Sequence, residues 1–290
     1  MARVLIAGCG YLGSELARRL AAEGHTVFGL RRTPGALPDG VQPVVADLCQ
    51  RDGLRAALAE VERGGIDAVA YTAAAERADD EAYRRAYVEG LANVVAWADA
   101  QGMRPPRVLF TSSTAVYAQD DGSWVDEESP TEPVHFAGRR MLEAERLLAP
   151  VSGVAVRLGG LYGPGRTRLV EAVRSGQARI RPGPPRWTNR IHRDDAAGAL
   201  HHLIERALRG EPLEACYVGV DDEPADEAEV LRWLAERLGV PPPAPAPGDA
   251  APPARGGNKR CRNARLRASG YRFTYPSFRE GYGALIGAAR

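Results

Sequence analysis

The chain has 290 residues, 44% of them hydrophobic, and a formal net charge of +1. It is long enough to bury a large core, and its even charge gives no reason to expect nucleic acid or an anionic membrane as a partner. No apolar run is long enough to span a bilayer, and a predicted strand begins at residue 3, so we expect neither a membrane span nor a signal peptide. Four scattered cysteines without CxxC spacing predict reduced thiols in a cytoplasmic protein.

The first 32 residues have the pattern of strand, glycine turn, helix and strand. Two apolar runs, Arg3–Ala7 and Thr26–Leu30, flank a helical pattern from Ser14 to Glu23. The turn between the first run and the helix is GCGYLG, residues 8–13. A GxGxxG turn placed between a strand and a helix predicts a dinucleotide-binding βαβ unit.

Each glycine of this turn has a separate predicted role. Gly8 lets the chain leave the strand in a tight turn, Gly10 lets the backbone approach a pyrophosphate, and Gly13 lets the helix pack closely on the strand. The helix N-terminus, with Tyr11 and Leu12, offers N–H groups and positive dipole to the phosphates. We therefore predict that residues 8 and 10–13 bind the cofactor.

Two arginines at the end of the second strand indicate which dinucleotide is bound. NAD-binding units usually have an acidic residue there, whereas this chain has Arg31 and Arg32. Guanidinium groups bind a 2′-phosphate bidentately and can stack on adenine, so the placement favours NADP, with NAD as the second choice. The alternative is that both are ordinary solvated arginines.

The strand–helix alternation continues to about residue 160. Strands alternating with helices require a parallel sheet with right-handed crossovers, and ligands of such sheets lie at the carboxyl ends of the strands. We therefore predict a doubly wound α/β Rossmann sheet. The expected strands are Gln42–Ala46, Ile66–Thr72, Arg107–Ser112 and Val154–Leu158, and the expected helices run from a cap at Asp52 to Arg63, from Asp79 to Gln101 and from Phe136 to Leu148.

The pattern loosens after residue 160, which predicts two domains. Residues 1–160 form the NAD(P)-binding domain, and residues 161–290 form a smaller mixed lobe that binds substrate and returns the chain to the sheet. In this lobe we expect a short strand at Ile180–Pro185, helices at Asp194–Leu208 and Glu227–Leu238, and a strand at Ala215–Val220. Pro, Ala and Gly dominate Val240–Gly257, which predicts an exposed loop.

Five motifs in this order resemble the NAD-dependent epimerase/dehydratase family, the extended short-chain dehydrogenases/reductases. They are GCGYLG, ADL, TSSTAVY, RLGGLYGPGR and NRIHRDD, and they cover nearly the whole chain. The resemblance implies that Asp47 and Leu48 flank the adenine, that Ala73 and Ala74 line the dinucleotide channel, and that Ser113 is the catalytic Ser/Thr. It also implies a small-molecule substrate held by the C-terminal lobe, in most members a nucleotide sugar.

The chain departs from this family at the acid/base pair, a Tyr four residues before a Lys on one helix. Aligning the family pattern places Ala137 at the Tyr position and Met141 at the Lys position. A shift by one residue gives Phe136 and Arg140 instead. Lys259 is the only lysine of the chain, so the pair cannot occur elsewhere. The resemblance is therefore to an atypical member.

Another group would have to transfer the proton. His135 directly precedes the vacated tyrosine position and would titrate near neutral pH, so we predict Ser113 and His135 as the catalytic residues. Tyr117 and His192 are weaker candidates, and Asp194 with Asp195 are expected to cap the helix that they begin. No cluster of His, Cys and carboxylates has ligand spacing, so we expect no metal.

Two classes of function follow. The first is an NAD(P)-dependent oxidoreductase, epimerase or dehydratase that acts on a sugar-nucleotide-like or other small hydroxyl or carbonyl substrate through non-standard residues. The second is a non-catalytic NADP(H) sensor or regulatory protein. Ser113 and the complete second lobe favour the enzyme, and the missing Tyr/Lys pair favours the sensor. A homodimer is compatible with either class.

Overall fold

The computed structural model describes residues 1–101, 106–247 and 257–288, in two compact units. Unit 1 comprises Met1–Val116, Thr131–Arg157 and Ala196–Tyr217, and unit 2 comprises Tyr117–Pro130, Leu158–Asp195 and Val218–Arg290. Each unit is described by itself. Within the residues that are described, no helix is long and apolar enough to cross a membrane.

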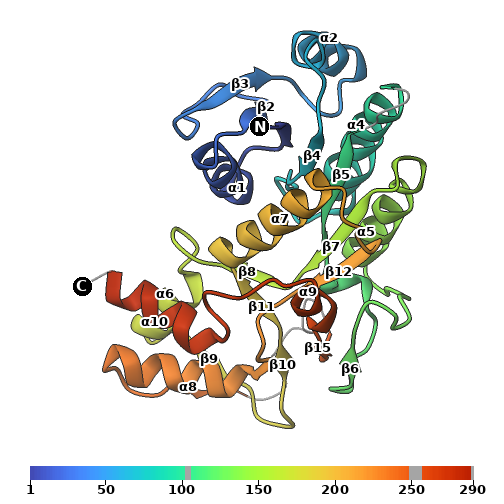
Figure 1. Ribbon diagram of the computed structural model, residues 1–290. Helices are drawn as coiled ribbons and strands as arrows, with labels where there is room; N and C mark the ends of the chain where they lie inside the picture. The colour runs from blue at the N-terminus through green and yellow to red at the C-terminus, as the bar shows by residue number, and fades with distance from the viewer. Residues whose placement is uncertain (102–105, 248–256, 289–290) are drawn as a thin grey trace. The chain divides into compact units, whose positions relative to one another are not determined.

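A seven-stranded parallel sheet dominates the fold, so the predicted Rossmann fold class is confirmed (Figure 1). The strand order is β3-β2-β1-β4-β5-β7-β12. Strands that follow β1 in the chain are added first on the side of β2 and then, from β4 on, on the other side. The change of side between β1 and β4 is the topological switch point at which such sheets bind ligands. The strands are β1 (Arg3–Ala7), β2 (Thr26–Arg31), β3 (Val41–Val45), β4 (Ala68–Tyr71), β5 (Arg107–Ser113), β7 (Val154–Leu158) and β12 (Cys216–Gly219).

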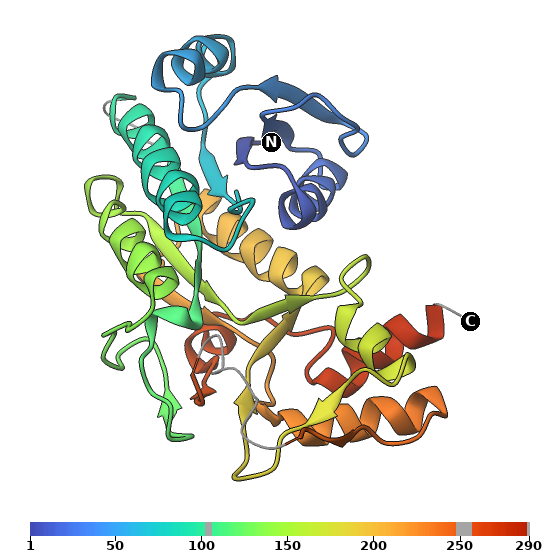
Figure 2. The same ribbon diagram turned by 180° about the vertical axis from the view of Figure 1, so that it is seen from behind.

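Helices of unit 1 cover both faces of this sheet. Figures 1 and 2 show α1 and α7 on one face and α4 and α5 on the other. The buried side of α1 carries Leu12, Leu16 and Leu20 at a spacing of one turn, as expected for an amphipathic helix. The helices are α1 (Tyr11–Ala22), α2 (Arg51–Glu62), α3 (Asp80–Tyr83), the π-helix η1 (Arg84–Glu89), α4 (Gly90–Asp99), α5 (Phe136–Arg146) and α7 (Arg193–Leu208), with 3₁₀ turns η2 (Thr114–Val116) and η3 (Ala149–Val151).

The region predicted as one helix from Asp79 to Gln101 is three consecutive pieces, α3, η1 and α4. The hydroxyl of Tyr71, which is fully buried on β4, donates a hydrogen bond to the carbonyl of Ala86 inside η1. A side chain that inserts into the helical hydrogen-bond ladder widens it locally into a π turn.

A second correction concerns α2, which begins at Arg51 after Gln50, so Asp52 lies in the first turn and is not the cap.

The described residues of unit 2 form short paired strands and four helices. The strand pairs are β8 (Gly160–Tyr162) with β11 (Arg190–His192), β10 (Trp187–Thr188) with β13 (Ala225–Asp226), β6 (Trp124–Val125) with β15 (Arg260–Cys261), and β9 (Arg179–Ile180) with β14 (Ala244–Pro245). The helices are α6 (Arg168–Arg174), α8 (Glu227–Leu238), α9 (Ala264–Ala268) and α10 (Phe278–Ala288). The core of the unit includes buried side chains of α6, α8 and α10, among them Val170, Leu234 and Phe278.

Several predictions for this unit need correction. The strand expected at Ile180–Pro185 is only the two-residue β9, because the Pro/Gly-rich residues that follow cannot continue a strand. β8 and β11 lie in segments for which no strand was predicted. Within the expected loop 240–257, residues 244 and 245 form β14, and residues 248–256 lie outside the described residues.

Candidate functional site

The turn after β1 is held in place by both neighbouring strands. Gly8 has a φ of +92°, and a Cβ on it would collide with the backbone of Ala73 beyond β4. The hydroxyl of Thr72 donates to the carbonyl oxygen of Gly8 at 2.9 Å, and the N–H of Cys9 donates to that of Leu30 at 2.9 Å. Gly8 is therefore required by the packing of the protein itself, before any ligand binds.

Gly10 and Gly13 differ in the space around them. A Cβ on Gly13 would lie 2.7 Å from the carbonyl oxygen of Gly8 and 2.9 Å from Ile6 Cγ2, so this glycine lets α1 pack against β1. A Cβ on Gly10 would have only that same carbonyl oxygen within 4 Å, at 3.9 Å. The turn therefore has open space at Gly10, where the pyrophosphate of a dinucleotide could approach.

The N-terminus of α1 fits an anionic group at this place. Gly10 is its N-cap, the cap makes no side-chain hydrogen bond, and no acidic residue lies in the first turn. The positive end of the helix dipole is therefore not neutralised by the described residues. Tyr11 and Leu12 are the first two residues of the helix, and Leu12 packs into the core. The diphosphate of a dinucleotide fits this arrangement.

Arg31 and Arg32 occupy different environments. Arg31 is the last residue of β2, and its Nη1 donates to the carbonyl oxygen of Ala36 at 3.0 Å, which folds the guanidinium onto the loop that follows. Arg32 is exposed and forms an ion pair with Glu76, and this guanidinium holds the pKa of the Glu76 carboxyl below its usual range. Of the two arginines, Arg31 is therefore the one that forms no ion pair with a carboxylate of the described residues.

The predicted adenine and channel residues follow β3 and β4. Asp47 Oδ1 accepts the N–H of Cys49 at 2.9 Å, and the carbonyl oxygen of the buried Leu48 accepts from Asn93 at 2.8 Å. Ala73 and Ala74 continue the chain beyond β4, next to the glycine turn. The parallel registers of β1 with β2 and β4 bring these segments to one edge of the sheet. Their contact with a cofactor stays a prediction.

Ser113 ends β5 at the same edge of the sheet. Its side chain is half-buried, and its Oγ accepts the N–H of Ala115 at 3.1 Å. This turn lies directly against α5, because a Cβ on Gly138 would collide with the carbonyl oxygen of Ala115. α5, the helix on which the Tyr/Lys pair was expected, therefore packs against the turn at the end of β5.

No phenol or ammonium replaces the missing pair on α5. Met141 is 5% exposed and part of the core. Arg140 donates from Nε to Asp80 Oδ1 at 2.8 Å and from Nη1 to Glu143 Oε2 at 2.8 Å, and it holds the pKa of Asp80 below its usual range. Arg140 is thus committed to two carboxylates, and Ala137 has no polar side chain.

His135 precedes the first residue of α5 and is exposed. Its imidazole does not cap the helix and has no hydrogen-bond or ion-pair partner among the described residues. A fixed general acid normally has a second group that orients it. His135 lacks such a group, and its role stays a prediction.

One buried group near Ser113 was missed by sequence reasoning. Glu145 on α5 accepts from the Ser112 hydroxyl at 2.6 Å and from Arg157 Nε and Nη2 at 2.9 and 2.8 Å. The side chains of Arg157 and Glu145 are only 8% and 10% exposed. This network joins α5 to β5 and β7. Local sequence pattern gives no signal for this network, because the partners of Glu145 lie on two other elements.

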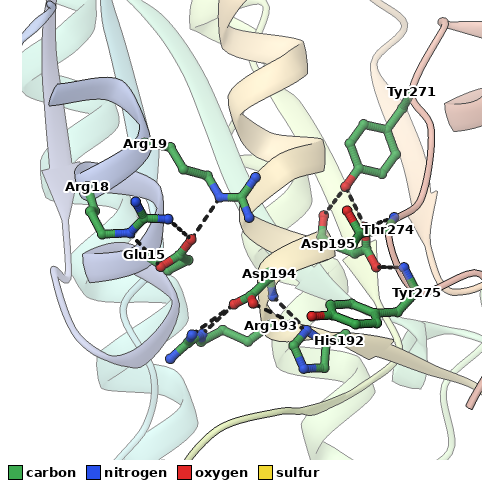
Figure 3. A network of polar contacts seen from close by, with 10 residues as sticks. All are labelled: Glu15, Arg18, Arg19, His192, Arg193, Asp194, Asp195, Tyr271, Thr274 and Tyr275. Atoms are coloured by element: carbon green, nitrogen blue, oxygen red, sulfur yellow. Dashed lines mark hydrogen bonds and ion pairs between the residues drawn. The ribbon is translucent and has the colours of Figure 1, made fainter. Parts of the chain in front are cut away.

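In unit 2, Asp195 of the NRIHRDD motif anchors the C-terminal segment (Figure 3). The carboxylate is fully buried; its Oδ1 accepts from the Tyr271 hydroxyl at 2.9 Å and the Thr274 N–H at 2.7 Å, and Oδ2 accepts the Tyr275 N–H at 2.8 Å. The prediction that Asp195 caps α7 was therefore wrong, because its carboxylate binds the C-terminal segment instead. Asp194 forms an ion pair with Arg193 at 2.8 Å.

Unit 2 also holds a buried polar cluster that the sequence did not indicate. Tyr162 Oη, Arg190 Nη1 and Asp221 Oδ2 are buried without a hydrogen-bond partner among the described residues. Burial raises the pKa of Asp221 to about 8, and the positive charge of Arg190 only partly opposes this. Asp221 follows the apolar strand β12, and nothing in the local pattern distinguishes it from a solvated aspartate.

Comparison with known proteins places this geometry in a family. The model of the NAD dependent epimerase/dehydratase family matches residues 4–219. A curated Streptomyces protein, 3-diazoavenalumate denitrifying reductase, is 34% identical, covering 97% of this chain and 99% of the relative.

Two solved structures agree. A candidate NAD-dependent epimerase/dehydratase from Methylobacillus flagellatus has a TM-score of 0.81 and 42% identity, covering 100% of this chain and 99% of that one. MoeE5, solved with UDP-glucose and NAD, has a TM-score of 0.79 and 26% identity over 99% and 98% of the two chains. The chain therefore belongs to the NAD-dependent epimerase/dehydratase family, whose members bind NAD(P) on a Rossmann sheet.

Proposed function

We propose that this protein is an NADP(H)-dependent reductase that reduces a small, electron-poor acceptor without a Tyr/Lys acid–base pair. One observation carries the proposal: the dinucleotide turn is intact and open above Gly10, whereas α5 has Ala137 and the buried Met141 at the two acid–base positions. Such a chain can bind the cofactor, but it has to rely on an acceptor that needs little help from a proton donor.

The residues that would hold the cofactor all lie in unit 1. The open turn at Gly10 and the N-terminus of α1 would receive the diphosphate. Arg31 would bind the 2′-phosphate, because Arg32 is already paired with Glu76. Asp47 and Leu48 would flank the adenine, and Ala73 and Ala74 would leave room for the dinucleotide beside the sheet. NADP is the proposed cofactor, and NAD is the second choice.

When bound, the reduced nicotinamide supplies a hydride. Ser113 would donate a hydrogen bond to the reacting heteroatom of the acceptor, and its own Oγ is positioned by the N–H of Ala115. A carbonyl acceptor would also need a proton, for which the exposed His135 is the proposed donor. α5 would contribute no proton, because its two relevant positions are apolar.

The chemistry of the Streptomyces relative suggests an acceptor class. Its name describes a reductase that removes nitrogen from a diazo compound. When hydride replaces a diazonium group, a C–H bond forms and N₂ leaves, so no proton has to be delivered to an oxygen. We propose that this chain takes acceptors of that electron-poor kind, with reactive carbonyl compounds as the alternative.

The test compares acceptors in the presence of NADPH. An arenediazonium salt and an aryl ketone are each incubated with protein and NADPH deuterated at C4, with protein-free reactions as the background. We expect NADPH consumption above background with the diazonium salt, deuterium in the product, and none of this with Gly10→Val. If no acceptor is reduced while NADPH binds, the reductase proposal fails.

One observation supports the sensor as a second candidate. His135 has no orienting partner among the described residues, and α5 has no acid or base at the reacting end. A sensor would bind NADPH and NADP⁺ with different affinities and would never consume NADPH. Calorimetric titration of both forms, combined with the acceptor panel, separates this candidate from the reductase.

A further inference from the structure

The C-terminal end of α1 and one face of α7 bring three metal-binding side chains together in unit 1. Glu23 is the C-cap residue directly after α1, and His201 and Glu205 lie one turn apart on α7. One ligand atom from each of the three lies within 4.8 Å of the other two. We propose that Glu23, His201 and Glu205 bind a divalent metal ion, with Zn²⁺ as the best match. This site is separate from the proposed cofactor site.

The local geometry leaves acceptor atoms facing one another. His201 Nε2 lies 3.1 Å from Glu23 Oε2, yet this nitrogen is buried and has no well-aligned hydrogen-bond partner among the described residues. Glu205 Oε1 is buried as well, and its only close contact among the described residues, His25 Nε2 at 2.9 Å, lacks the alignment of a hydrogen bond. A neutral imidazole lone pair beside two carboxylates is repulsive unless a proton or a cation lies between them. A metal ion satisfies all three groups together.

His25 contacts Glu205 from outside the proposed metal site. Its Nδ1 accepts the N–H of Ala2 at 3.2 Å, so in the neutral ring the proton is on Nε2, which lies 2.9 Å from Glu205 Oε1. Metal-binding carboxylates usually have such a partner outside the coordination sphere. Arg209 is the competing cation, 4.0 Å from Glu205 Oε2, but its side chain is 54% exposed and can move into solvent.

The ligand set indicates the metal. One imidazole nitrogen and two carboxylate oxygens suit Zn²⁺, whose charge balances two carboxylates, and a water molecule can complete the tetrahedron. Glu23 is 53% exposed, which gives the ion a route from solvent. The sequence predicted no metal because the ligands come from helices far apart in the chain. Figure 1 shows these helices, α1 and α7, on the same face of the sheet.

A metal at this place would tie α1 to α7. α1 presents its N-terminus to the proposed diphosphate site, so the ion would hold the opposite end of the same helix. The expected consequence is greater thermal stability of the folded chain, because an ion that binds only the folded state stabilises it by mass action.

The test is Zn²⁺ titration of the full chain after treatment with a chelator. We expect one Zn²⁺ per chain with a Kd on the order of 1 μM, and a rise in Tm of about 5 °C at a hundredfold excess over Kd. Glu23→Gln, His201→Ala and Glu205→Gln should each weaken binding at least about tenfold and remove the shift in Tm. His202→Ala, on the next position of α7 and a different face, should bind as the wild type does.

The design also decides the negative outcomes. Glu23→Gln changes an exposed residue at a helix end, so it tests the site even if a variant on α7 fails to fold. If the wild type binds no Zn²⁺ below about 100 μM, or if Glu23→Gln and His201→Ala bind it as tightly as the wild type, the proposal is wrong. In the second case the ion is held by other groups, such as the cysteines.

Discussion

Two segments at the same edge of the sheet differ in how far they follow the family's sequence pattern. The turn between β1 and α1 has open space above Gly10 and a helix N-terminus without a side-chain cap, two features that suit a dinucleotide. The first half of α5 has Ala137 and the buried Met141 at its two acid–base positions. Under the proposed function, cofactor binding and proton transfer belong to separate segments of this fold, so that one can be absent while the other is present.

The largest expected effect concerns the buried network through which Glu145 holds α5 against the sheet. Glu145→Ala should lower the free energy of unfolding by about 3–5 kcal/mol, because it leaves the buried Arg157 without its carboxylate. Chemical denaturation measures this change. Glu143→Ala, which removes an exposed partner of Arg140, is the matched control and should cost less than about 1 kcal/mol. Equal effects would mean that the buried network does not hold α5 in place.

The next effect tests the turn. Gly10→Val should weaken NADPH binding at least about 100-fold, or roughly 2.7 kcal/mol, because the side chain fills the open space above the turn. Its Tm should stay close to that of the wild type. Gly8→Ala should do the reverse and destabilise the fold, since its Cβ collides with Ala73 at a φ of +92°. Unchanged NADPH affinity in Gly10→Val would remove the cofactor site from the account.

A third prediction uses the pH dependence of stability and concerns unit 2. The pKa of Asp221 is raised to about 8 in the folded chain, so between about pH 4 and pH 8 the folded state holds a proton that the unfolded state has released. Stability should therefore fall as pH rises through this window, by about 1.4 kcal/mol for each pH unit, and level off above it.

Asp221→Asn stays neutral at every pH and should remove this decline, as measured by denaturant titration at several pH values. The exposed Asp39→Asn is the control and should keep the decline. A wild type whose stability rises between pH 5 and pH 8 would show that Asp221 is ionised in the fold.

These predictions also show what the sequence could and could not provide. The bounds of β7 and α8 follow from local pattern alone, and so does the glycine turn, because each depends on neighbouring residues. The π turn in η1 depends on Tyr71 of another strand, and the role of Asp195 depends on Tyr271 and Tyr275. The cluster of Glu23, His201 and Glu205 arises only when α1 meets α7. Long-range partners of this kind leave no periodic signal in the sequence.

The smallest expected effect concerns cofactor choice. Arg31→Asp should lower the preference for NADPH over NADH by about tenfold or more, because it removes the proposed phosphate ligand and adds repulsion. Arg32→Asp should have less effect, since Arg32 is already paired with Glu76. Calorimetry with both reduced cofactors measures the preference. A wild type that prefers NADH would make both arginines ordinary surface charges.

The central claim is that this chain transfers hydride from NADPH without an acid–base pair on α5. The most direct measurement is turnover of C4-deuterated NADPH with the arenediazonium acceptor by the wild type, Gly10→Val and Met141→Leu. The account predicts deuterated product from the wild type and from Met141→Leu at rates within about threefold, since Leu replaces Met at nearly constant volume, and none from Gly10→Val. NADPH that binds to the wild type and is never consumed, with this or any other acceptor of the panel, would contradict it.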